Sequence, residues 1–232
     1  MYKKTSLFIK ILTYILWVPV ILSISFEIIT FSDWVYEYNW ERNNISNESN
    51  IFKDQLNEVS DQIKDYFKND KEKIEISLQQ PGMQIFNLFN QREIDHMVDV
   101  KNLIQTTLLF EKIGTAILII CLIMLIYIEK FKKIDEIIRN IIIKSFLLWG
   151  SFLSIIIVGM IVNFNYTFII FHRLLFRNDL WILNPKTDFL LILFPQRFFL
   201  EIAIGILGLF FLINILVLIT IKIIKSRFLK FS

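Results

Sequence analysis

Four long apolar runs constrain this chain more than any other feature of its sequence. They cover residues 7–29, 113–128, 146–164 and 198–221. A helix needs ~20 mostly apolar residues to cross ~30 Å of hydrocarbon, and inside lipid it satisfies its backbone hydrogen bonds within one segment. The runs raise the hydrophobic share of the 232 residues to 55%, whereas a soluble domain has ~45–50%. They predict an all-α, polytopic membrane protein with four transmembrane helices.

The first run resembles a signal peptide, because Lys3 and Lys4 precede it. Its apolar core is longer than the usual signal-peptide core, and no cleavage site with small residues follows it. We therefore interpret this run as a retained membrane anchor.

The distribution of Lys and Arg predicts the orientation in the membrane. Five of these residues lie in the connector 129–145, four lie in the tail 222–232, and two precede the first run. Four spans put these segments on one side, which is therefore cytoplasmic. Residues 31–110 contain 8 Lys and Arg against 14 Asp and Glu and are expected outside. The net charge of +3 is therefore an average over segments on the two sides of the membrane. The sequence contains no soluble basic domain of the kind that binds nucleic acid.

Six parts follow from these assignments. They are a first transmembrane helix (1–30), an extracellular cap (31–110), a second transmembrane helix with a cytoplasmic connector (111–145), a third transmembrane helix (146–164), an extracellular aromatic-rich loop (165–197), and a fourth transmembrane helix with a cytoplasmic tail (198–232). Within the cap, Ile51, Leu56, Val59, Ile63 and Phe67 recur at helical spacing, so the cap is expected to be helical.

A short helix near the end of the cap carries the first of two histidines. Asn90 is the expected N-cap, and Glu93 can reach back to it. Glu93, His96 and Asp99 are spaced three apart and share one side of the helix, which would suit proton transfer. A solvated acidic face with an incidental histidine is the alternative. An upright helix would lift His96 ~24 Å above the second span, so we expect the helix to lie along the membrane surface.

The second histidine, His172, belongs to a loop that is crowded with aromatic residues. Charged residues are interleaved with these rings, namely Arg173, Arg177, Asp179 and Asp188. Charge in an apolar shell at membrane depth indicates function, although an aromatic belt at the membrane interface would look similar. Both histidines are expected at the outer boundary of the membrane.

Two stretches resemble the bacterial lipoprotein intramolecular transacylase family, whose members have four spans and an extracellular cap. They are Arg92-Glu93-x-x-His96-Met97-x-Asp99-Val100-Lys101 and Phe171-His172-x-Leu174-x-Phe176-x-Asn178-Asp179-x-Trp181, and Asn184-Pro185-x-Thr187-Asp188 continues the second. The chain departs from the family at Leu175, where a second aromatic residue is expected.

The resemblance implies an acyltransferase that moves the sn-2 acyl chain of a diacylglyceryl lipoprotein to the amino group of its N-terminal cysteine, which gives the lyso-form. It implies His96 and His172 as catalytic residues. The substrate-binding candidates are Arg92, Glu93, Asp99, Lys101, Arg173, Asp179, Trp181 and Asp188. No cofactor and no metal are expected. The expected partners are diacylglyceryl lipoproteins and membrane lipid, and the expected form is a monomer with its active site on the outer face of the bacterial cytoplasmic membrane.

The sequence does not decide which histidine acts as the base and which as the acid. The carboxylates near His96 favour it as the more basic one, and Arg173 would lower the pKa of His172. Arg92, Lys101, Arg173 and Arg177 are candidates for binding an oxyanion or a lipid phosphate.

Two other classes of protein fit parts of the sequence. A metal-dependent membrane hydrolase could use Glu93, His96 and His172 as ligands, but the HExxH motif is absent. A non-enzymatic membrane assembly or transport protein would place polar groups at mid-bilayer, whereas the apolar runs are almost purely apolar at their centres. The lone cysteine, Cys121, lies within the second run and is expected to pack as a small apolar residue.

Overall fold

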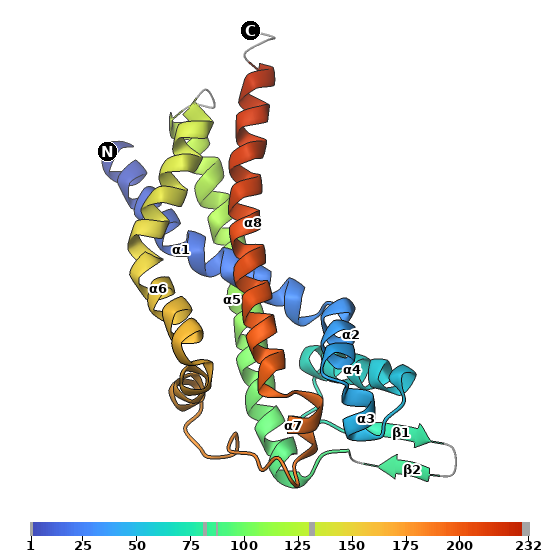
Figure 1. Cartoon of the computed structure of the whole chain (residues 1–232). Helices are drawn as coiled ribbons and strands as arrows, with labels where there is room; N and C mark the ends of the chain where they lie inside the picture. Colours follow the sequence, from blue (N-terminus) through green and yellow to red (C-terminus); the bar gives the residue numbers. More distant parts are fainter. Residues whose placement is uncertain (1, 81–82, 87, 130–132, 229–232) are drawn as a thin grey trace. The chain divides into compact units, whose positions relative to one another are not determined.

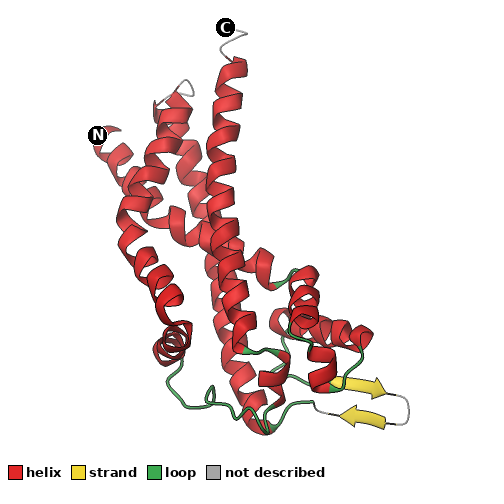
Figure 2. Ribbon diagram, in the orientation of Figure 1, coloured by secondary structure: helices red, strands yellow, loops and turns green. Residues whose placement is uncertain are grey.

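The structure is a computed structural model that describes residues 2–80, 83–86, 88–129 and 133–228. It is almost entirely helical (Figure 2). The elements are α1 (Tyr2–Thr30), α2 (Asp33–Arg42), α3 (Ile45–Ser49), α4 (Lys53–Lys68), β1 (Ser77–Gln80), β2 (Met83–Phe86), α5 (Gln91–Glu129), α6 (Ile134–Leu175), α7 (Phe189–Leu193) and α8 (Gln196–Phe228). Four of them, α1, α5, α6 and α8, are long and apolar enough to cross a membrane. The all-α, four-span fold is therefore confirmed.

The chain forms two compact units. The membrane unit comprises Met1–Glu27, Leu108–Val158 and Gly205–Ser232, and the cap unit comprises Ile28–Thr107 and Gly159–Ile204. In Figure 1 the N-terminal turns of α1, the start of α6 and the C-terminal turns of α8 lie at the same end of the membrane unit.

The core of the membrane unit is apolar and contains a buried polar link. Phe210 and Leu125 are completely buried, and Cys121 is buried beside them in the same cluster, as expected for a packed thiol. Trp17 donates a hydrogen bond from Nε1 to Oδ1 of Asn214 at 2.9 Å. In lipid such a bond links helices, because an unpaired polar group there is costly.

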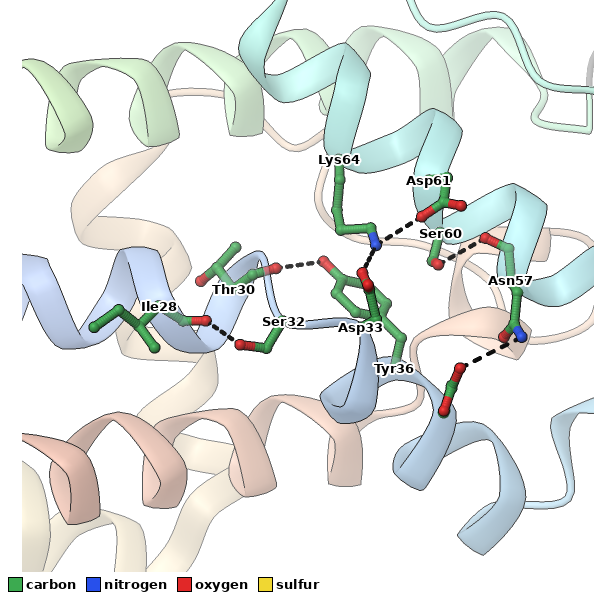
Figure 3. Close-up of polar contacts among 10 residues, drawn as sticks. Ile28, Thr30, Ser32, Asp33, Tyr36, Asn57, Ser60, Asp61 and Lys64 are labelled. Atoms are coloured by element: carbon green, nitrogen blue, oxygen red, sulfur yellow. Dashed lines mark hydrogen bonds and ion pairs between the residues drawn. The ribbon is translucent and has the colours of Figure 1, made fainter.

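The cap unit packs α4 against the start of α2. The predicted amphipathic spacing in α4 is confirmed, because Leu56, Val59 and Ile63 are buried. Figure 3 shows the polar contacts at this junction: Lys64 forms ion pairs with Asp33 and Asp61. The cap also contains an element that the sequence did not predict, an antiparallel hairpin in which Ser77 pairs with Phe86.

The expectation that the helix carrying His96 turns away from the second span to lie along the membrane surface is wrong. α5 is one helix of 39 residues. The apolar residues in the first half of α5 have neighbours in the cap. Met97 and Ile104 are buried, and Gln105 donates hydrogen bonds to the carbonyls of Phe67 (3.3 Å) and Asn69 (3.1 Å) at the end of α4. The cap therefore covers this part of α5.

The loop expected to begin at residue 165 is helical as far as Leu175, because α6 continues through a kink. At the kink Asn163 leaves helical geometry, with φ −158° and ψ 92°. Its Oδ1 accepts the backbone N–H of Tyr166 at 3.0 Å, which is how an N-cap side chain starts a helix. Gly159 fits this bend, since a Cβ there would lie 2.9 Å from Oγ1 of Thr167.

Candidate active site

His96 stands one turn into α5, at a helix start that is fixed by two reciprocal hydrogen bonds. The backbone N–H of Asn90 donates to Oε2 of Glu93 at 2.8 Å, and the N–H of Glu93 donates to Oδ1 of Asn90 at 3.1 Å. This is the capping box that the sequence predicts. It sets the first turn of α5 and thereby the direction in which His96 projects.

Glu93 also binds a second helix. Its other oxygen, Oε1, accepts the N–H of Leu190 at the start of α7 at 2.5 Å, and the residue is only 1% exposed. Burial raises the pKa of Glu93, and the N–H groups of Leu190 and Asn90 oppose that rise. One carboxylate therefore caps two helices that are almost a hundred residues apart in the sequence.

Asp188 extends this junction into the preceding loop. Its Oδ1 accepts hydrogen bonds from Nδ2 of Asn90 (3.0 Å) and Oγ1 of Thr187 (2.8 Å), and its Oδ2 accepts the N–H of Asn184 at 2.7 Å. The hydrogen bond from Asn184 is the main reason that the pKa of Asp188 is lowered. These three hydrogen bonds order the loop that leads into α7.

His172 lies on the last turn of α6 and has a defined tautomer. Its Nδ1 is 2.7 Å from the carbonyl oxygen of Phe168. A carbonyl oxygen can only accept, so Nδ1 carries the hydrogen and Nε2 carries the lone pair. This arrangement leaves Nε2 available as a base.

The structure brings the two histidines together inside a shell of aromatic rings. Their ring centroids are 6.2 Å apart, and both residues are buried. Phe176 lies 5.3 Å from His96 and 5.6 Å from His172. Three more rings surround His172, namely Phe168 at 4.2 Å, Trp181 at 5.1 Å and Phe171 at 5.4 Å. Both imidazoles thus lie side by side in surroundings formed largely by aromatic rings.

Burial keeps both imidazoles neutral. It lowers the pKa of His96 to about 4, with a further contribution from His172, while Asp99 opposes the shift. Burial also lowers the pKa of His172, and the Phe168 carbonyl opposes it. Both residues lie outside the apolar runs that define the spans. The expectation that nearby carboxylates make His96 more basic is wrong, because its desolvation outweighs the field of Asp99, and Glu93 is engaged with backbone groups. Burial, and not the neighbouring Arg173, lowers the pKa of His172.

The remaining predicted site residues differ in what they contact. Trp181 packs on His172 as described. Asp99 accepts a hydrogen bond from Nδ2 of Asn178 at 2.8 Å, and Arg92 donates to the backbone carbonyl of Asp179 at 2.6 Å. These two contacts tie α5 to the segment after α6. Arg173 is exposed.

Lys101 is engaged away from the rings. Its Nζ donates to Oδ1 of Asn69 at 3.1 Å and to the carbonyl of Lys71 at 2.5 Å, and it lies 4.3 Å from the ring centroid of Tyr66. Lys101 therefore holds the segment that follows α4.

Sequence reasoning missed the carbonyl of Phe168 as the partner of His172. A spacing of four at Phe164, Phe168, His172 and Phe176 is the signal that predicts this segment as a helix, and in a helix the carbonyl four residues earlier lies nearby. Among the residues that the structure describes, no three His, Cys, Asp or Glu side chains converge as metal ligands would.

The four membrane-spanning helices, with a buried histidine pair in the cap unit, define the class: an all-α, membrane-integral protein. A family model for the lipoprotein intramolecular transacylase Lit matches residues 11–199, so the chain belongs to that family. It is therefore an enzyme, a membrane transferase of lipoprotein processing. The alternatives of a non-enzymatic membrane protein and a metal-dependent hydrolase are set aside by this membership.

Solved structures of this family share the fold. A structure of the membrane-integral lipoprotein intramolecular transacylase Lit from Bacillus cereus matches with a TM-score of 0.77 at 20% identity, and the match covers 99% of this chain and 100% of that one. Two variants of the same protein, with one histidine replaced by arginine or by alanine, match with TM-scores of 0.74 at 20% identity, over 99% of this chain and 96% and 97% of theirs. A comparison with curated proteins finds no match.

Proposed function

We propose that this transacylase moves the sn-2 acyl chain of a diacylglyceryl lipoprotein to the amino group of its N-terminal cysteine, with His96 and His172 as the catalytic pair. The observation that carries the proposal is the pairing of two buried imidazoles, 6.2 Å apart between ring centroids, with one of them held in a single tautomer by a backbone carbonyl. Since one chain supplies both histidines, the proposed active form is a monomer.

The reaction forms one bond and breaks one. The cysteine nitrogen attacks the acyl carbonyl carbon, a C–N bond forms, and the C–O bond to the sn-2 oxygen breaks. One proton moves in total from the nitrogen to the glyceryl oxygen. Imidazole, with an unperturbed pKa of ~6.5, can carry that proton at neutral pH. An ester becomes an amide, so the step is downhill and needs no ATP or acyl carrier.

His172 is the proposed base. Its Nδ1–H is committed to the Phe168 carbonyl, so the proton from the amine would go to Nε2. The imidazolium formed in this way would keep that carbonyl as a partner. It would also lie near the rings of Phe168 and Trp181, whose electron-rich faces stabilise a cation. The same nitrogen would return the proton to the leaving glyceryl oxygen.

His96 is the proposed electrostatic partner. With its pKa lowered to about 4 it stays neutral at pH 7, so an N–H of the ring can donate to the oxyanion of the tetrahedral intermediate without itself carrying charge. Its buried Nδ1 has no hydrogen-bond partner within the described residues, which fits a group reserved for the substrate.

The aromatic shell would supply confinement. Attack within one lipoprotein molecule closes an eight-membered ring through acyl carbon, ester oxygen, two glyceryl carbons, sulfur, Cβ, Cα and nitrogen. Holding these atoms near the attack geometry can contribute up to ~7–11 kcal/mol. The rings of Phe168, Phe171 and Phe176 are placed to hold apolar chains around the histidines.

We propose that the enzyme lies in the bacterial cytoplasmic membrane with both termini cytoplasmic and the histidine pair on the outer face. The support is the concentration of Lys and Arg in the connector 129–145 and the tail 222–232. The positions of the ends of α1 and α8, at one end of the membrane unit (Figure 1), agree with an even number of spans.

Substitution of each histidine tests the pair. His96→Ala and His172→Ala should each abolish transfer on a diacylglyceryl lipopeptide, and the double variant should be no worse than either, because residues that act as a unit are non-additive. Lys186→Gln, at an exposed loop position, is the control and should keep wild-type activity. Full activity in either single variant would remove that histidine from the mechanism.

A further inference from the structure

The helical segment 164–175, which follows the kink at Asn163, has two different faces. On one face Phe164, Phe168 and His172 follow each other at a spacing of four, with ring centroids 5.8 Å and 4.2 Å apart. The other face exposes Tyr166, Ile169, Ile170 and Leu174, and Leu174 is 79% exposed. The site thus occupies one side of this helix, and the described residues of the cap unit leave the opposite side exposed.

Two arginines border the exposed face. Arg173 is on the last turn of α6, and Arg177 follows four residues later, just after Phe176 donates its N–H to the carbonyl of His172 at 2.8 Å. Arg177 lies two residues beyond the end of α6, so the two arginines are close together in the chain. Both arginines are exposed. Neither forms an ion pair or hydrogen bond with any residue in the described part of the chain.

The other two cations considered for a lipid phosphate are already occupied. Arg92 donates to the carbonyl of Asp179, and Lys101 donates to Asn69 and Lys71. Of the four cations, two therefore bind other parts of the protein, and Arg173 and Arg177 remain available to a ligand. Both of these lie next to an exposed apolar surface.

In a membrane protein, exposed apolar side chains next to unpaired arginines are typical of a helix at the membrane interface. An amphipathic helix with large apolar side chains and basic residues lies in the interface, with the apolar side chains among acyl chains and the cations at the headgroups. The guanidinium group presents paired N–H donors that match a phosphate. Attraction to an anionic lipid surface adds about fivefold in binding for each basic residue.

We propose that Arg173 and Arg177 form a binding site for the phosphate of an anionic glycerophospholipid, and that the exposed face of residues 164–175 lies among its acyl chains. The bound lipid would anchor the helix whose inner face carries His172. The inference concerns a lipid that is not consumed, and it does not depend on the roles proposed for the histidines.

Lipid binding tests the site directly. Native mass spectrometry of the detergent-solubilised protein, titrated with phosphatidylglycerol or phosphatidylcholine, should show a preference for phosphatidylglycerol. The double variant Arg173→Gln/Arg177→Gln should lose about 25-fold of that preference if the two residues contribute additively, while Lys186→Gln in the nearby loop should keep it. An unchanged preference in the double variant would overturn the proposal. Displacement of the lipid by millimolar inorganic phosphate would also overturn it, because the site would then bind free phosphate.

The depth of the helix is a second, independent measurement. A spin label on Leu174→Cys, in a Cys121→Ala background reconstituted in phosphatidylglycerol-containing vesicles, should be more accessible to oxygen than to a water-soluble nickel complex. A label on Asn47→Cys, an exposed position of α3, is the matched control and should show the reverse. A Leu174 label with the accessibility of the Asn47 label would place this helix in water and refute the inference.

Discussion

Replacing Glu93 by glutamine removes the carboxylate that caps both α5 and α7. Glu93 accepts the N–H of Asn90 with one oxygen at 2.8 Å and the N–H of Leu190 with the other at 2.5 Å. A glutamine amide has one oxygen, so it can keep one of these hydrogen bonds. Its NH₂ group would face the second backbone N–H, and two donors cannot pair.

The expected cost follows from the burial of the site. A hydrogen bond to a charged group contributes about 1.5–3 kcal/mol, and a buried donor left without a partner costs a similar amount. Because Glu93 is 1% exposed, water cannot replace the lost acceptor. We expect the junction between α5 and α7 to open about 2–3 kcal/mol more easily, which is about a 30- to 150-fold increase in local opening.

Hydrogen exchange followed by mass spectrometry measures this opening. Peptides containing Asn90 and Leu190 should exchange faster in Glu93→Gln by that factor, and turnover should fall because His96 is one helical turn away. Asp95→Asn is the control: Asp95 accepts a hydrogen bond from Gln91 and forms an ion pair with Lys73 across 3.7 Å at the surface, so its loss should cost less than about 1 kcal/mol. Unchanged exchange at Leu190 in Glu93→Gln would refute the double-cap reasoning.

Three further predictions concern pH, chemistry and topology. Because the pKa of His96 is lowered to about 4, the neutral histidine contributes stability above pH ~6.5 that is lost as the pH falls towards 4. The melting temperature in detergent should fall over that pH range, and it should fall less in His96→Gln. EDTA and thiol reagents should leave activity intact, and Cys121→Ala should behave like wild type; loss of activity in EDTA with recovery on adding zinc would favour a metal enzyme. In Cys121→Ala cells, an impermeant thiol reagent should label Asn47→Cys and Lys186→Cys but not Asn140→Cys, and labelling of Asn140→Cys would reverse the orientation.

The sequence predicted what depends on local pattern. The four apolar runs predicted the membrane helices, and Asn90 with Glu93 predicted a capping box that the hydrogen bonds confirm. The lone Cys121 was expected in the core and is buried there. Each of these inferences uses residues within a few turns of one another, where spacing fixes geometry.

What the sequence could not predict depends on contacts across long stretches of chain. The second hydrogen bond of Glu93 joins residues 97 positions apart. The partners of Lys101 lie thirty or more residues earlier, so the sequence alone could not predict that Lys101 binds the segment after α4. The pKa of His96 was misjudged for the same reason, because the desolvation that lowers it comes from packing, while the sequence shows only neighbouring carboxylates.

The most direct test of the central claim is an isotope-crossover experiment with the purified enzyme. A diacylglyceryl lipopeptide with isotopically labelled acyl chains is mixed with an unlabelled one, and the products are analysed by tandem mass spectrometry. We predict products of unchanged mass in which one acyl chain has become amide-linked to the N-terminal cysteine, with no exchange of label between the two populations. Acetylation of the cysteine amine should stop the reaction. Scrambled labels would show transfer between molecules, and loss of one acyl chain would show hydrolysis; either result would contradict intramolecular transfer by this enzyme.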